Sequence, residues 1–267
     1  TAEGPVLITA GPGTGKTYTL VQRAIYLIEE CGVKPESIFI ATFTEKAAKE
    51  LITRITNELS DRGIVANINE MYIGTFHSLC LRILKENLEF TRLRRNYRLL
   101  DAFDQQYMVF QNIYRFRNIP EVESALPNGG AWKQSEAICN YVNNLSEELV
   151  TPEELMSDTD VSIAALGQML KEYRDVLTEG NMMDFSSIQI EAYHLLCDHA
   201  DILEEMRSKV THIMVDEYQD TNFIQEQLVF LLAGDRKNIC VVGDDDQGLH
   251  RFRGATIRNI LEFPQKF

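Results

Sequence analysis

Short apolar runs alternate with longer segments of helical spacing along much of this 267-residue chain. The apolar runs, which we expect to be buried strands, are residues 6–9, 38–42, 71–75, 212–215 and 239–242. Apolar side chains recur at helical intervals in residues 16–30, 45–59, 76–89 and 223–232. Strands that alternate with helices favour right-handed crossovers, so the pattern predicts an α/β fold, a parallel sheet flanked by helices.

Residues 93–182 have a different pattern, without the apolar runs of a sheet. Helical spacing is found at residues 104–116, 135–149 and 161–178, and the segments are separated by PNGG at 127–130 and by Thr151-Pro152. We therefore expect a helical insertion at 93–182, within a sheet domain formed by residues 1–92 and 183–267.

The first apolar run leads into AGPGTGKT at residues 10–17, which has the composition of a phosphate-binding loop. Glycine allows the tight turn that aims backbone N–H groups at phosphate oxygens, at the positive end of the following helix. Lys16 would reach the β and γ phosphates, and the Thr17 hydroxyl would hold Mg²⁺. The residues expected to touch nucleotide are Gly11, Gly13, Thr14, Gly15, Lys16, Thr17 and the next residue, Tyr18. An ordinary glycine-rich turn is the alternative.

The fourth apolar run ends in Asp216-Glu217-Tyr218-Gln219-Asp220. We expect this strand to lie next to the one that precedes the phosphate loop, which would put Asp216 where a nucleotide's Mg²⁺ needs a second ligand. Glu217 would orient or deprotonate the attacking water. The alternative is an acidic loop that faces solvent.

The fifth run continues into acids and then into GLHRFRGA, and here the sequence resembles a known family. The segments AGPGTGKT, ATFTEKAAKEL, GTFHSL, VDEYQDTN and VVGDDDQGLHRFRGA are similar to the ordered motifs of superfamily I DNA helicases of the UvrD/Rep/PcrA type. The resemblance implies a RecA-like P-loop NTPase sheet and the use of ATP and Mg²⁺. It also implies that residues 93–182 are the accessory subdomain called 1B and that the rest is motor domain 1A.

The resemblance assigns a role to several individual residues. It implies Lys16, Glu217 and Gln247 as catalytic residues, with Gln247 sensing the γ-phosphate, and Thr17 and Asp216 as metal ligands. It implies contacts to single-stranded DNA by Thr42, Phe43, Thr44, Thr75, Phe76, His77, His250, Phe252 and Arg253. Phe43 and Phe76 could instead be core residues, and His77 could be a structural histidine.

The chain departs from the family pattern at several residues, among them Ala10, where glycine usually opens the phosphate loop. Tyr18 stands where arginine is usual, so a nucleotide contact is lost or replaced by stacking. His250 and Phe252 stand where tyrosine and tryptophan are common. Since one base stacked on an aromatic ring is worth about 1–3 kcal/mol, we expect weaker DNA stacking there.

The resemblance predicts the amino-terminal motor half of an ATP-dependent helicase or translocase that moves 3′ to 5′ on single-stranded DNA. Its substrates would include junctions of single- and double-stranded DNA, in repair or replication. The second motor domain of the same chain is expected beyond Phe267, so this part alone should hydrolyse ATP weakly. The alternatives are the helicase part of an end-resecting helicase-nuclease and a non-motor module that binds nucleotide or DNA.

Composition and charge add two expectations. No apolar stretch is long enough for a membrane span and the five cysteines are scattered, so we expect a cytoplasmic protein with reduced thiols. The net charge is −14, so any DNA affinity must come from local basic groups. The strongest candidate is residues 92–98, with four arginines and a tyrosine; a solvated helix end is the alternative.

Overall fold

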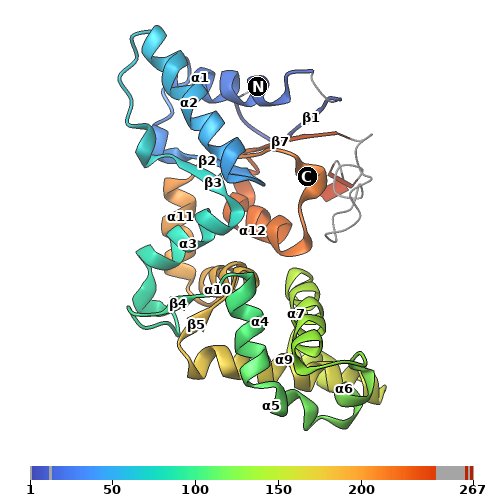
Figure 1. The fold of residues 1–267 in the computed structure, drawn as a ribbon. Helices are drawn as coiled ribbons and strands as arrows, with labels where there is room; N and C mark the ends of the chain where they lie inside the picture. Colours follow the sequence, from blue (N-terminus) through green and yellow to red (C-terminus); the bar gives the residue numbers. More distant parts are fainter. Residues whose placement is uncertain (1, 12–13, 245–261, 264, 267) are drawn as a thin grey trace. The chain divides into compact units, whose positions relative to one another are not determined.

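The computed structural model describes residues 2–11, 14–244, 262–263 and 265–266, and the chain divides into two compact units. The first unit comprises residues 1–83 and 193–267, and the second comprises 84–192. The first unit contains a five-stranded sheet in the order β1-β7-β6-β2-β3, in which every pairing is parallel (Figure 1). The strands are β1 (Val6–Thr9), β2 (Ile38–Thr42), β3 (Tyr72–Thr75), β6 (His212–Val215) and β7 (Ile239–Gly243). The predicted parallel α/β fold is confirmed.

One detail of the sheet corrects the expectation from the sequence. The strand that carries Asp216, β6, is not the neighbour of β1, because β7 lies between them and pairs with both. Residues of β7 are buried along the whole strand, as expected for a central strand covered on both faces. The sequence marks each strand as buried but does not fix their lateral order.

Helices cover both faces of this sheet. Figure 1 shows α1 (Lys16–Glu29) and α2 (Glu45–Asp61) on one side and α11 (Ala200–Lys209) and α12 (Phe223–Ala233) on the other. The apolar sides of α1 and α2 form one core with the strands, built from Leu20, Ile25, Leu51, Ile55, Ile38, Ile40, Met214, Cys240 and Val242. Helix α3 (Phe76–Glu86) starts directly after β3.

The second unit is mainly helical and contains its own core. Its helices are α4 (Ala102–Gln111), α5 (Ile113–Arg117), α6 (Pro120–Ala125), α7 (Ala131–Glu147), α8 (Pro152–Met156) and α9 (Val161–Glu179). A short parallel ladder joins β4 (Arg98–Leu99) to β5 (Met182–Met183), and α10 (Phe185–Asp198) continues from this unit into the first. The insertion predicted at residues 93–182 falls within this unit.

The helix expected at residues 104–116 is divided in two at Asn112. The Asn112 backbone leaves the helical region, and its side-chain Nδ2 donates to the carbonyl of Met108 at 2.9 Å. Asparagine competes for backbone hydrogen bonds in this way, which favours a break. Among the described residues, no helix combines the length and apolar character required to cross a membrane.

Candidate active site

The phosphate loop leads from β1 into α1 through a glycine that the geometry requires. Gly15 is the N-cap of α1, with φ of 96°, a left-handed conformation that other residues adopt only with strain. Before it, Thr14 Oγ1 donates to the carbonyl of Gly11 at 2.7 Å, which closes the turn. Because no side chain caps the helix, its first N–H groups remain available to an anion.

Lys16, the first residue of α1, points to the carboxylates at the ends of two other strands. Its Nζ lies 3.0 Å from Glu217 Oε2, after β6, and 3.7 Å from Asp244 Oδ2, after β7. Lys16 is 9% exposed and Asp244 is fully buried, so the charges interact in a poorly solvated place. Residues more than 200 positions apart in the chain thus meet at one edge of the sheet.

Asp216 and Glu217 lie at the end of β6 in an unusual backbone geometry. Glu217 has φ 49° and ψ 46°, the left-handed region, and its N–H donates to Asp216 Oδ1 at 3.1 Å. Non-glycine residues in this region are strained and are common at functional sites. Burial, and secondarily the Glu217 charge, raise the pKa of Asp216 from 3.8 to about 6.

Two further residues complete this cluster, and the sequence interpretation did not assign them a role. Gln219 Nε2 donates to Glu217 Oε2 at 2.8 Å, and its Oε1 accepts from the Asp244 N–H at 2.9 Å. Gln219 thereby ties the ends of β6 and β7 together. Asp244 could have been found, since it follows a buried strand as Asp216 does; the bridging role of Gln219 has no sequence signal.

Three carboxylates around one ammonium leave an excess of negative charge that a divalent cation would neutralise. No group of three or more His, Cys, Asp or Glu side chains is arranged as a complete metal cage among residues 2–11, 14–244 and the described C-terminal positions. Mg²⁺ bound to a nucleotide does not need one, because one or two protein ligands suffice beside phosphate oxygens and water. The residues present therefore fit a magnesium nucleotide.

Six of the expected DNA-contacting residues lie at the ends of β2 and β3, which are neighbouring strands. Thr42 pairs with Thr75 in the ladder, and both are buried. Thr44 Oγ1 accepts from Ala47 N–H at 3.1 Å and so caps α2, while Thr75 Oγ1 accepts from Ser78 N–H at 3.2 Å at the start of α3. These hydroxyls thus have structural partners at two helix starts.

The two phenylalanines differ in accessibility. Phe76 is 3% exposed, whereas Phe43 is partly exposed, and their rings pack edge to face with centroids 6.1 Å apart. Phe43 is therefore the ring that a base could reach, and Phe76 supports it from the core. His77, next in the chain, is partly exposed.

Two of the remaining expected site residues follow Lys16 in the first turn of α1. Thr17 is partly buried in the first turn of α1, and Tyr18 beside it is 57% exposed, so its ring is accessible to a ligand. Gly13, Gln247, His250, Phe252 and Arg253 lie outside the described residues.

Fold and site together define a class of protein. A phosphate loop between the first strand and helix of a parallel sheet, with an aspartate-glutamate pair at another strand end, is the arrangement of RecA-like P-loop proteins.

Comparison with known proteins identifies the family within this class. The chain belongs to the UvrD/REP helicase N-terminal domain family, whose model matches residues 1–267. Similar proteins include the ATP-dependent DNA helicases PcrA of Staphylococcus epidermidis and Staphylococcus aureus, each 35% identical over the whole chain. The chain spans 35% of the length of these relatives.

Proposed function

We propose that the chain is the ATP-binding motor half of a DNA helicase or translocase that moves 3′ to 5′ on single-stranded DNA. The observation that carries the proposal is the meeting of Lys16 with Glu217 and Asp244 at the end of the phosphate loop. Family membership supports DNA as the substrate, since the similar PcrA proteins are named ATP-dependent DNA helicases. Junctions of single- and double-stranded DNA, a second motor domain of the same chain, DNA repair or replication, and the cytoplasm belong to the same proposal.

In this proposal each residue of the cluster has one task. The N–H groups of the phosphate loop and the Lys16 ammonium would bind phosphate oxygens. Thr17 and Asp216 would hold Mg²⁺, which when bound neutralises charge at the transferred phosphoryl group. Glu217 accepts the proton of the attacking water. Gln219 Nε2 holds the Glu217 carboxylate in place by donating to its Oε2. The exposed Tyr18 ring contacts the nucleotide.

Glu217 and Asp244 pair with the Lys16 ammonium, and the phosphate oxygens of a nucleotide would compete for this ammonium. A triphosphate carries several negative charges, so Lys16 would exchange Glu217 for phosphate oxygen, and Glu217 would then be free to act on water. On the DNA side, the partly exposed Phe43 stacks on a base, with Thr42, Thr44, Thr75, Phe76 and His77 shaping the surface around it.

The test is Glu217→Gln in the full-length protein that contains this chain. The amide keeps the size of the side chain, and its oxygen can still accept the hydrogen bond from Gln219 Nε2, but it cannot act as a base. We expect MgATP binding within a few fold of wild type and DNA-stimulated ATP turnover reduced by at least about a hundredfold. The exposed carboxylate Asp61, at the end of α2, provides the control Asp61→Asn, which should leave both unchanged. Undiminished turnover in Glu217→Gln would contradict the assigned role.

A further inference from the structure

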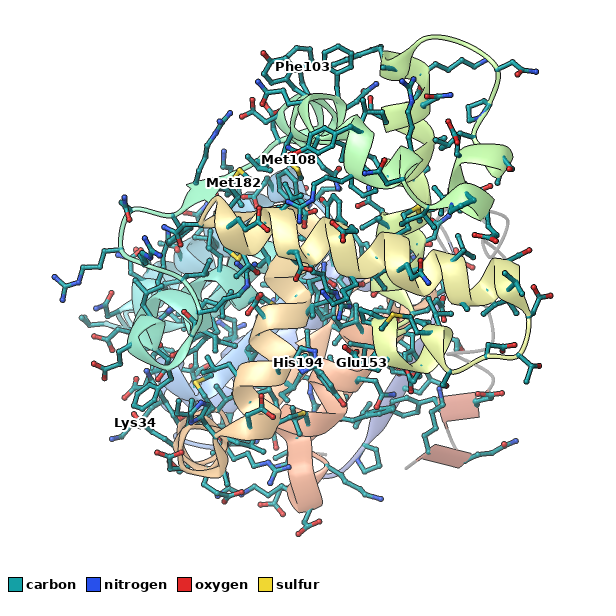
Figure 2. The ribbon with its side chains drawn as sticks, turned by 90° about the horizontal axis from the view of Figure 1, so that it is seen from below. Lys34, Phe103, Met108, Glu153, Met182 and His194 are labelled. Carbon is teal, nitrogen blue, oxygen red and sulfur yellow. The ribbon has the colours of Figure 1, made fainter. Side chains whose placement is uncertain are left out.

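Four aromatic rings form an exposed patch on the second unit. Phe103, Tyr107 and Phe110 come from α4, and Trp132 comes from the first turn of α7. Their side chains remain 65%, 42%, 37% and 40% exposed, respectively. Figure 2 shows Phe103 on the outer side of α4, whereas Met108 of the same helix is directed inward. We call these four residues the aromatic patch.

The rings of the patch touch one another rather than being scattered. Phe103 and Tyr107 are stacked at 6.4 Å between centroids, and Tyr107 and Phe110 are stacked at 6.3 Å. Trp132 contacts Phe103 at 5.6 Å and Phe110 at 5.7 Å. Gln106 Nε2 donates to the Trp132 carbonyl at 3.0 Å, which fixes α4 beside α7. The patch is thus a preorganised surface, which lowers the entropic cost of binding.

Positive groups border the patch at both ends. Arg98, 60% exposed, is held 2.8 Å from Asp104, the residue next to Phe103. At the other end Lys133 follows Trp132 and is exposed, and Arg117 donates to Gln134 Oε1 at 2.6 Å. Glu136, one turn beyond Trp132, is the opposing charge on that side of α7.

The charges of the second unit are unevenly distributed along the sequence. Residues 92–117 contain six arginines and two aspartates, whereas residues 147–160 contain six carboxylates and no Lys or Arg. Three of the four patch residues, Phe103, Tyr107 and Phe110, lie in the basic part. Contiguous exposed aromatic surface marks an interaction site, and its basic border indicates an anionic partner with flat apolar groups.

We propose that the aromatic patch binds single-stranded DNA by base stacking, with Arg98, Lys133 and Arg117 placed to meet the phosphates. Aromatic rings interleaved with cations bind single strands without sequence preference, because every base has a π face. A duplex hides those faces within its own stack, so it should bind far more weakly here. The inference rests on the proposed motor function, to which this surface adds a contact with the same polymer through residues of the second unit.

The test uses the fact that Trp132 is the only tryptophan of the chain, so its fluorescence reports on the patch directly. An oligodeoxythymidylate is titrated into this chain without nucleotide, while Trp132 emission is recorded. We expect saturable quenching by the single strand and not by a blunt duplex of equal length. Phe103→Ala, an exposed substitution that the fold should tolerate, should weaken the binding about tenfold.

A control variant lies on α7, the helix that carries Trp132. Tyr141 is 47% exposed and follows Trp132 by nine residues, two and a half helical turns, so it faces the opposite side of α7. Tyr141→Ala should leave the quenching curve unchanged. Lys16→Ala should also leave it unchanged, so failure of the nucleotide site and failure of the patch are distinguishable.

Any one of the following results would overturn the inference. The first is DNA binding, detected by anisotropy of a labelled strand, without any change in Trp132 emission. The second is equal quenching by duplex, or an unaltered curve for Phe103→Ala. The third is a Trp132 emission that depends on protein concentration without DNA, together with a dimer in sedimentation, because a second copy of the chain would then cover the patch.

Discussion

The surroundings of Asp216 disfavour the ionised form of its carboxyl group. It is 3% exposed and lies beside Glu217, so its pKa is raised to about 6 in the folded chain. In the unfolded chain the pKa of this carboxyl is near 3.8. Between pH 3.8 and about 6 the folded state therefore keeps a proton on Asp216 that the unfolded state has lost. Stability is therefore highest below about pH 4 as far as this group is concerned, and it falls as pH rises towards about 6.

Asp216→Asn should remove this pH-dependent loss. The amide cannot ionise and its Oδ1 can still accept from the Glu217 N–H. Above about pH 6 we expect the variant to unfold with a free energy roughly 2–3 kcal/mol larger than that of wild type, and below about pH 4 the two should be similar.

Urea unfolding at one pH on each side of this window measures the difference. A stability difference that is the same at both pH values would show that the Asp216 pKa is not raised. In the full-length protein, the metal role proposed for Asp216 predicts that the same variant loses Mg²⁺-dependent ATP turnover, since an amide is a poor magnesium ligand.

At the scale of elements, α8 and α9 approach each other closely where Gly167 lies. A Cβ added there would be 2.7 Å from the Met156 backbone N and 2.8 Å from the Pro152 carbonyl O, both in the other helix. Glycine is therefore required for packing in the middle of α9, although it is a poor helix former. Backbone atoms cannot move aside as a flexible side chain can.

Gly167→Ala should consequently destabilise the second unit by about 1–3 kcal/mol, against the roughly 1 kcal/mol gain that helix propensity alone would give. The matched control is Gly180→Ala at the end of α9, where the added Cβ would meet the Met182 side chain, which can rotate away. Thermal unfolding of both variants provides the comparison. An increase in melting temperature for Gly167→Ala would contradict the packing argument.

The elements predictable from the sequence were those with a long or strongly apolar pattern. Residues 6–9, 38–42 and 212–215 were expected as strands and are β1, β2 and β6, because buried parallel strands are continuous apolar runs between turn residues. Helices α6 and α8 were missed, since five or six residues show no helical period. The longer helices α10 and α11 were not predicted either. The two-residue strands β4 and β5 were missed because their pairing depends on tertiary contacts alone.

The site was predictable only in part, for a related reason. Residue type and spacing were enough to identify the loop glycines, Lys16 and the acids at 216 and 217 as site candidates. The bridge from Gln219 to Asp244 depends on β7 lying beside β6, which local sequence does not specify. Burial of Phe76 but not Phe43 likewise depends on which ring faces the core.

For the whole molecule, net charge and local charge have opposite consequences. With a net charge of −14, the surface as a whole repels DNA, which discourages indiscriminate binding. Under the proposed function, DNA affinity comes from small areas, namely the strand ends near Phe43 and the border of the aromatic patch. A motor that moves along its track needs this kind of moderate, reversible contact.

The central claim is that this chain binds a magnesium nucleotide between the phosphate loop and the acids after β6, and calorimetric titration with MgATP tests it most directly. Wild type and Asp61→Asn should bind alike, while Lys16→Ala should bind about ten- to a hundredfold more weakly, because a charge-assisted bond to phosphate is lost. Far-UV circular dichroism establishes that the variant is folded. Binding of MgATP by folded Lys16→Ala with wild-type affinity would contradict the account.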